Sequence, residues 1–181
     1  MKNIIIKKLC LFYFINIILS CQAQADKFKQ LSTDNFSISY PNYLRLDKSK
    51  IDGTEFILFT KKTSETDNFI ENINLVTYDY NMTLKEHIKY SNTEITKIAT
   101  IIKSEIIENN NLKIHRIIYE ATENNISLTV LQHSLIVNNK IFVLTFCGKS
   151  IDINKYLSEM EDVMLSFKLL KHDNYIEPQR L

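Results

Sequence analysis

The chain has 181 residues, with 22 Lys and Arg against 21 Asp and Glu, and a formal net charge of +1 at pH 7. This length corresponds to one domain. A balanced charge without a basic stripe disfavours a nucleic-acid-binding protein, because phosphate recognition needs clustered Lys and Arg. Gly53 and Gly148 are the only glycines, so a Gly-rich phosphate loop or a dinucleotide fingerprint is excluded in its usual form.

Residues 1–20 form a predicted signal peptide. Three lysines precede an apolar run from Leu9 to Leu19 that only Asn16 interrupts. The run is shorter than the ~20 apolar residues that a membrane-spanning helix needs, and a permanent anchor helix is the alternative. Removal of residues 1–20 takes the three lysines away and leaves a mature chain with a slight excess of acidic residues.

A lipid-attachment motif follows the apolar run. Ile18-Leu19-Ser20-Cys21 resembles the bacterial lipobox, which implies cleavage between Ser20 and Cys21 and a lipid on Cys21. The alternative is ordinary cleavage after Ala23-Gln24-Ala25, which would release a soluble secreted or periplasmic product. We therefore expect a protein of the bacterial cell envelope, lipid-anchored to a membrane and facing the periplasm or the exterior.

The rest of the chain divides into three parts. Polar residues without a clear period predict a lipidated tether over 21–34, and the domain is expected over 35–170. A polar C-terminal tail over 171–181 is expected to be flexible. Cys10 leaves with the signal peptide and Cys21 carries the lipid, so Cys147 is the remaining free thiol and no disulfide forms within the mature chain.

The first half of the domain is predicted to hold strands and one helix. Alternating or apolar runs bounded by turn signals predict strands at Phe36–Tyr40, Glu55–Lys61 and Asn72–Tyr80. Thr83 and Glu86 have capping-box spacing, which predicts a helix start. The side of this helix that faces the core is expected to hold Leu84, Ile88, Ser91 and Ile95.

The second half is predicted to be four strands and a final helix. The strands are Thr100–Glu108, Leu112–Thr122, Ile126–Val137 and Lys140–Cys147, with Asn-rich turns between them. Asn tolerates positive φ, so Asn138-Asn139 predicts a two-residue hairpin. The final helix is expected over about residues 153–167, with an apolar stripe of Ile153, Leu157, Met160, Met164 and Phe167.

This order of elements predicts an α+β fold. It resembles the PsbP-like superfamily, which includes the bacterial DcrB-type lipoproteins and a yeast Ran-binding protein. The likeness runs through Phe36–Pro41, Asn72–Leu75, Thr83-Leu84, Ile141–Thr145 and Ser166-Phe167, whereas Leu112-Lys113-Ile114 stands where the family often has a glycine. The resemblance implies an antiparallel sheet of about six to seven strands flanked by helices, an α/β/α sandwich, and a binding or accessory role without catalysis.

The sequence assigns no catalytic residue, metal ligand or cofactor site. No two of His87, His115, His133 and His172 lie three or four residues apart, and a Cys-x-x-Cys pair is missing, so no local zinc motif exists. His115 and His133 lie in adjacent predicted strands and either meet across the sheet or, as we favour, make ordinary contacts. Cys147 lies in an apolar segment, where a free cysteine usually behaves as a small hydrophobe.

Two other groups of side chains are interpreted as structural. Glu159, Glu161 and Asp162 lie away from the apolar stripe of the final helix and are expected on a solvated face. Tyr78 and Tyr80 near a strand end are expected to pack as strand aromatics rather than to form a binding rim.

Two classes of function stay open. We favour a non-enzymatic envelope lipoprotein with a binding or accessory role and an unidentified protein or ligand partner. The alternative is an enzyme, hydrolase-like, whose site assembles from distant residues. The family resemblance also suggests a chaperone-like binder of secreted proteins.

The lipobox hypothesis predicts the chemistry of the mature N-terminus. Expression of the full chain in a bacterial host should give a diacylglyceryl or triacylglyceryl Cys21 by intact mass, and Cys21→Ser should abolish that modification. An unmodified N-terminus at Asp26 in both proteins would contradict the lipid anchor.

Overall fold

The computed structural model describes residues 27–65 and 67–170. The predicted signal peptide, the lipid-attachment residues Ser20 and Cys21, and the predicted C-terminal tail lie outside the described residues. None of the helices in the described part of the chain has the length and hydropathy needed to cross a membrane.

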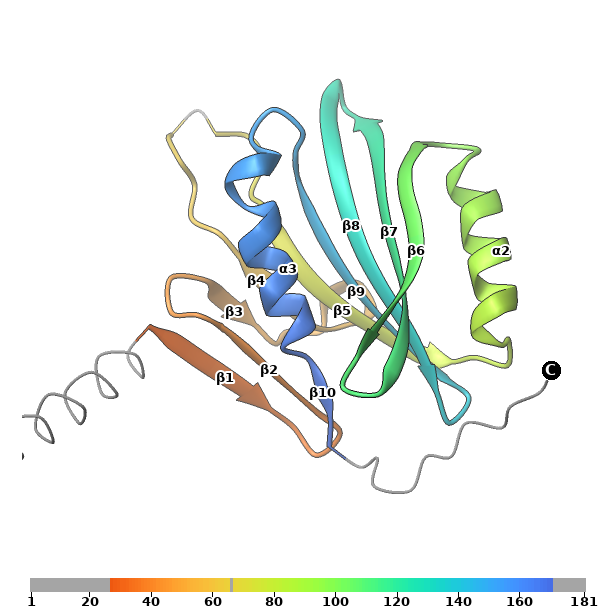
Figure 1. The fold of residues 1–181 in the computed structure, drawn as a ribbon. Coiled ribbons are helices and arrows are strands. Elements are labelled where there is room, and N and C mark those ends of the chain that lie inside the picture. Colours follow the sequence, from red (N-terminus) through yellow and green to blue (C-terminus); the bar gives the residue numbers. More distant parts are fainter. Residues whose placement is uncertain (1–26, 66, 171–181) are drawn as a thin grey trace, which may run out of the picture.

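Seven strands form one antiparallel sheet, called here the large sheet (Figure 1). Their order is β3 (Arg45–Asp47), β4 (Thr54–Phe59), β5 (Asn72–Asp79), β9 (Lys140–Lys149), β8 (Ile126–Val137), β7 (Leu112–Glu123) and β6 (Thr100–Asn109). A second sheet has the order β1 (Phe28–Ser32), β2 (Phe36–Pro41) and β10 (Lys168–Leu169). The predicted α+β class, with a mainly antiparallel sheet flanked by helices, is confirmed.

Asparagine pairs set the hairpins that connect the long strands. Asn138 and Asn139 between β8 and β9 have φ of 51° and 55°. The pairs Asn110-Asn111 and Asn124-Asn125 also have positive φ at both positions. A two-residue turn with positive φ at both central residues matches the right-handed twist of the flanking strands. Because Asn tolerates positive φ, the Asn pairs marked these turns in the sequence. The observed strand ends lie within two residues of the predicted ones.

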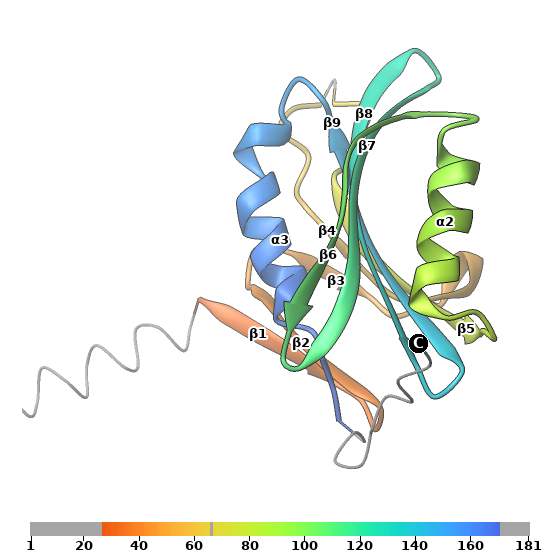
Figure 2. The ribbon, with the colours of Figure 1, turned by 45° about the vertical axis from the view of Figure 1, so that its right-hand side comes forward.

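The helices α2 (Leu84–Ile95) and α3 (Leu157–Leu165) cover opposite faces of the large sheet (Figure 2). We call these the α2 face and the α3 face. The predicted capping box opens α2, where the Thr83 N–H donates to Glu86 Oε2 at 2.8 Å and the Glu86 N–H donates to Thr83 Oγ1 at 3.3 Å. Of the residues within α2, His87 is the buried one, while the predicted apolar positions are only half-buried.

The final helix is shorter than predicted. A 3-10 turn, Ile153–Lys155, precedes α3, and the chain leaves the helix after Leu165. The C-terminal end of α3 is fixed to the second sheet, because Ser166 Oγ accepts the N–H of Ser39 at 2.9 Å. Together, α3 and the second sheet cover the α3 face.

Strand β1 corrects the predicted tether over 21–34. Phe28–Ser32 pairs antiparallel with β2, with Leu31 opposite Ile38, and Leu31 is buried. The remaining side chains of β1 are exposed, so the segment has no alternating pattern that the sequence could show. The domain therefore begins before Phe36. Strands β3 and β10, of three and two residues, were likewise not predicted.

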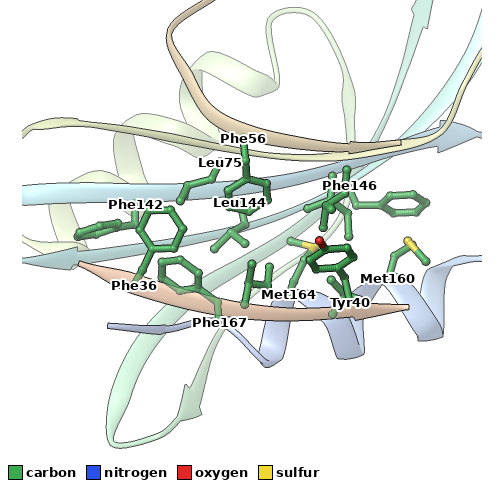
Figure 3. Close-up of a cluster of buried hydrophobic side chains, with 14 of the residues drawn as sticks. Phe36, Tyr40, Phe56, Leu75, Phe142, Leu144, Phe146, Met160, Met164 and Phe167 are labelled. Atoms are coloured by element: carbon green, nitrogen blue, oxygen red, sulfur yellow. The ribbon is translucent and has the colours of Figure 1, made fainter. Parts of the chain in front are cut away.

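The hydrophobic core lies between the α3 face and the elements that cover it (Figure 3). Phe56, Leu75 and Phe146 from the large sheet are completely buried. The predicted apolar stripe of the last helix supplies Met160, Met164 and Phe167 from the opposite side, and β2 supplies Phe36 and Tyr40. This layer holds the second sheet and α3 to the large sheet.

Truncation in this layer should destabilise the protein strongly. Phe146→Ala removes a fully buried ring and leaves a cavity, so the free energy of unfolding should fall by about 3–5 kcal/mol in a denaturant titration. Ile151→Ala, at a side chain that is 91% exposed, is the control and should change it by less than about 0.5 kcal/mol. Equal effects of the two substitutions would contradict the described core.

Candidate functional site

A cleft of about 480 Å³ opens where the second sheet meets the large sheet. Its walls come from the β1–β2 turn, β10, the β3–β4 connection and the β8–β9 hairpin, and Figure 1 places the β1–β2 and β8–β9 turns at the same end of the molecule. Pockets for small ligands occupy roughly 300–1,000 Å³, so the size fits a small ligand or a few residues of a peptide.

The floor of the cleft is apolar. It is lined by Leu31, Phe36, Val137, Phe142 and Leu169. All except Leu169 are buried, and all five also belong to the hydrophobic core or pack against it. The cleft is therefore the open end of the core layer, and a bound apolar group would continue the packing of the protein interior.

The rim of the cleft carries three lysines and two carboxylates. Lys50 forms an ion pair with Glu55 at 3.3 Å, and Glu55 also accepts a hydrogen bond from Thr77 at 3.0 Å. In the described part of the chain, neither Lys48 nor Lys140 forms an ion pair. Asp34 is the remaining carboxylate of the lining. The rim thus has an excess of one positive charge.

Backbone turns place the lysines at the rim. Lys50 has a φ of 58° and Asp52 a φ of 52°, in the short 3-10 turn before β4. Lys140 follows directly after the Asn138-Asn139 turn. The side chains that form the cleft belong to several separate segments, so no sequence motif marks it, and residue spacing alone could not have located it.

A second polar cluster, under α2, contains two of the histidines. His87 Nδ1 lies 3.0 Å from the Tyr80 hydroxyl, and the rings of His87 and His115 meet edge to face at 5.7 Å. His115 Nε2 lies 2.9 Å from Ser104 Oγ, which donates to Asn92 Oδ1 at 3.1 Å. Burial lowers the pKa of both histidines, to about 4 for His115, where His87 adds to the effect.

His115 and His133 do not meet across the sheet. This agrees with the alternative that we favoured from the sequence. His115 pairs with Ser134 and His133 with Arg116 in the β7–β8 register. The one-residue offset puts the two histidines on opposite faces of the sheet. His133 faces the core, is 1% exposed, and has a pKa lowered by burial to about 4.

The expectation of a solvated acidic face on the final helix is wrong for Glu161. Arg116 donates to both carboxylate oxygens of Glu161, at 2.5 and 2.9 Å, and to Glu105 at 3.0 Å. The Arg116 guanidinium lowers the pKa of Glu161. Arg116 lies on β7, far from α3 in the sequence, so no local pattern could predict this pair. It connects α3 to the large sheet.

The side chains of Cys147, Tyr78 and Tyr80 are not activated for catalysis. Burial raises the pKa of Cys147 to about 11, so its thiol stays protonated at neutral pH. Tyr80 packs edge to face on Tyr78 at 5.8 Å and bonds to His87, which is the predicted packing role, while Tyr78 is 48% exposed. Among the described residues, no group of three or more His, Cys, Asp or Glu side chains is arranged to hold a metal ion.

Comparison with known proteins gives a likeness of fold. No family model and no curated protein sequence matches the chain. Among solved structures, cyanobacterial PsbP (CyanoP) from Synechocystis sp. PCC 6803 is similar, with a TM-score of 0.58, 16% identity, and coverage of 80% of this chain and 94% of that chain. LpqN of Mycobacterium tuberculosis, described as involved in cell envelope biogenesis, has a TM-score of 0.59 and 8% identity, with 81% and 93% covered.

A structure from Bacteroides thetaiotaomicron VPI-5482 has a TM-score of 0.57 and 14% identity, and the match covers 83% of this chain and 51% of that one. The described residues therefore have a PsbP-like fold, as the order of elements predicted.

The buried histidines predict a loss of stability on acidification. The pKa values of His115 and His133 are about 4 in the folded chain against 6.5 for the free side chain, so the unfolded chain binds protons first as the pH falls below 6.5. Each histidine should remove about 1–2 kcal/mol from the free energy of unfolding between neutral pH and about pH 5. Glu105 and Glu161 have lowered pKa values and lose their contribution only near and below 4.5.

Denaturant titrations across this pH range check the prediction. His115→Gln should remove about 1–2 kcal/mol of this pH dependence, because residue 115 then no longer titrates while His87 and His133 still do. If the free energy of unfolding of His115→Gln varied with pH as much as that of the wild-type protein, the lowered pKa of His115 would be contradicted.

Proposed function

We propose that this protein is a non-enzymatic, lipid-anchored protein of the bacterial cell envelope that binds a ligand in the cleft between the two sheets. The observation that carries the proposal is the combination of an apolar floor, including Phe36 and Phe142, with Lys48 and Lys140 at the rim. Neither lysine has an ion-pair partner in the described part of the chain.

The lining favours a ligand that combines an apolar body with an anionic group. The apolar body would replace water on the core side chains of the floor, at about 25 cal/mol for each Å² of apolar surface removed from water. The anionic group would lie near Lys48 and Lys140, while Lys50 stays paired with Glu55. Asn35 and Asn138 add amide groups that can fix its orientation.

The positions of the side chains with strongly shifted pKa values support binding over catalysis. The buried histidines lie under α2 and in the core beside α3, and Cys147 lies in β9 with a protonated thiol. None of them lines the cleft. Active sites usually bring groups with shifted pKa values together in a pocket. Because the histidines and Cys147 lie away from the cleft, a binding role is favoured.

The predicted signal peptide and lipobox support a location in the cell envelope. LpqN, a protein of similar fold, is described as involved in cell envelope biogenesis, which supports the same location. The segment between Cys21 and Phe28 spans at most about 25 Å when fully extended, so a lipid on Cys21 would hold the domain close to the membrane surface.

Anilinonaphthalene sulfonate, an aromatic anion whose fluorescence rises in apolar surroundings, tests the cleft. It should bind residues 21–181 carrying Cys21→Ser, a chain without the lipid, and give a saturable signal. The double variant K48E/K140E reverses both unpaired rim charges and should weaken this binding at least tenfold.

The matched control reverses two lysines outside the cleft. K62E/K85E changes the net charge equally at exposed positions and should leave the affinity within about twofold. Equal losses in the two double variants would mean that the dye responds to total charge, and the proposed cleft site would be wrong.

A further inference from the structure

Among residues 27–65 and 67–170, strand β6 forms an open edge of the large sheet. It has ten residues, and within this part of the chain it pairs with β7 on one side only. A free edge presents unpaired backbone N–H and C=O groups, which makes it a template for another strand. Figure 1 shows β6 as the outermost strand on the side of α2.

Apolar side chains are exposed along this edge. Ile102 and Ile106 are 57% and 56% exposed. Ile102 has no partner on β7, because the register shifts at a β-bulge between Ile101 and Lys103. Tyr90 on α2 and Ile98, just before β6, are exposed nearby in the chain. Exposed β-branched residues on a free edge favour strand addition.

The sequence of β6 is complementary to itself in the antiparallel direction. Residues 101–107 read Ile-Ile-Lys-Ser-Glu-Ile-Ile, with Ser104 at the centre. When two copies pair about Ser104, Lys103 of each lies opposite Glu105 of the other, and Ile102 lies opposite Ile106. Directly opposed side chains of opposite charge stabilise a strand pair, and like charges destabilise it.

Charge selects this register over its neighbours. A twofold axis at Lys103 would place two lysines opposite each other, and an axis at Glu105 would place two carboxylates opposite each other. Within one chain, Lys103 already pairs with Glu105 at 2.8 Å on the same face of the strand. In the paired strands Lys103 and Glu105 stay on the same face of the sheet, and each also lies opposite a side chain of opposite charge from the other copy.

We propose that two copies of this chain associate through β6, in an antiparallel pair centred on Ser104. The twofold axis makes the contact isologous and joins the two seven-stranded sheets into one continuous sheet. Because the axis is perpendicular to the sheet, both α2 helices lie on the same face. This contact is separate from the cleft and stands independently of the proposed function.

A charge-swap experiment tests the proposal on the full-length chain. Two differently tagged copies are coexpressed, extracted from membranes in mild detergent, and captured through one tag. K103E places like negative charges opposite each other in a homodimer, and E105K places like positive charges opposite each other. Each variant should therefore lose at least tenfold of the wild-type self-capture, whereas K103E coexpressed with E105K should recover it, because opposite charges then face each other at both contacts.

Recovery of the mixed pair also shows that both variants fold. Failure of the wild-type copies to capture each other, full self-capture by K103E, or no recovery in the mixed pair would each overturn the proposal.

A cysteine pair tests the register. Ile102→Cys/Ile106→Cys should give a covalent dimer on mild oxidation, because residue 102 of one copy faces residue 106 of the other. Within one chain these positions lie about 13 Å apart, which is too far for a disulfide. A chain that stays monomeric on oxidation would contradict the Ser104-centred register.

Discussion

The packing of α3 and the second sheet against the large sheet is the contact on which the rest of the structure depends. Phe146 and Phe56 are completely buried in this layer, and Ser166 fixes the end of α3 to β2. The same layer ends at the cleft, where Phe36 and Phe142 are both core residues and floor residues. The cleft is therefore an open continuation of the core, and its shape depends on the same contacts that stabilise the fold.

The two faces of the large sheet carry different polar contacts, and strand register separates them. Arg116 and His133 face α3, where Glu161 neutralises the guanidinium inside a largely apolar layer. His115, one residue from Arg116, faces α2 and meets His87. An ion pair that is largely removed from water contributes little net stability but is costly to break. Arg116 and Glu161, whose side chains are 12% and 21% exposed, therefore serve mainly to fix how α3 lies on the sheet. The histidine contact does the same for α2 without an ion pair.

Local signals explain which elements the sequence could predict. The Asn-rich turns and the capping box of Thr83 depend on neighbours within a few residues, and the sequence located the long strands and α2 from them. Strands β1, β3 and β10 form because of pairing with distant segments, and they are too short or too exposed to show a pattern. The cleft and the contact of Arg116 with Glu161 arise from the same long-range packing, so neither had a signature in the sequence.

We propose that the open end of the core binds a ligand with an apolar body and a negative charge. This binding can be measured by NMR, by following the amide chemical shifts of residues 21–181 carrying Cys21→Ser during titration with anilinonaphthalene sulfonate. We expect saturable shifts at Asn35, Asn138 and Lys140, with little change under α2. Shifts centred on His87 and His115, or spread over the surface without saturation, would contradict it.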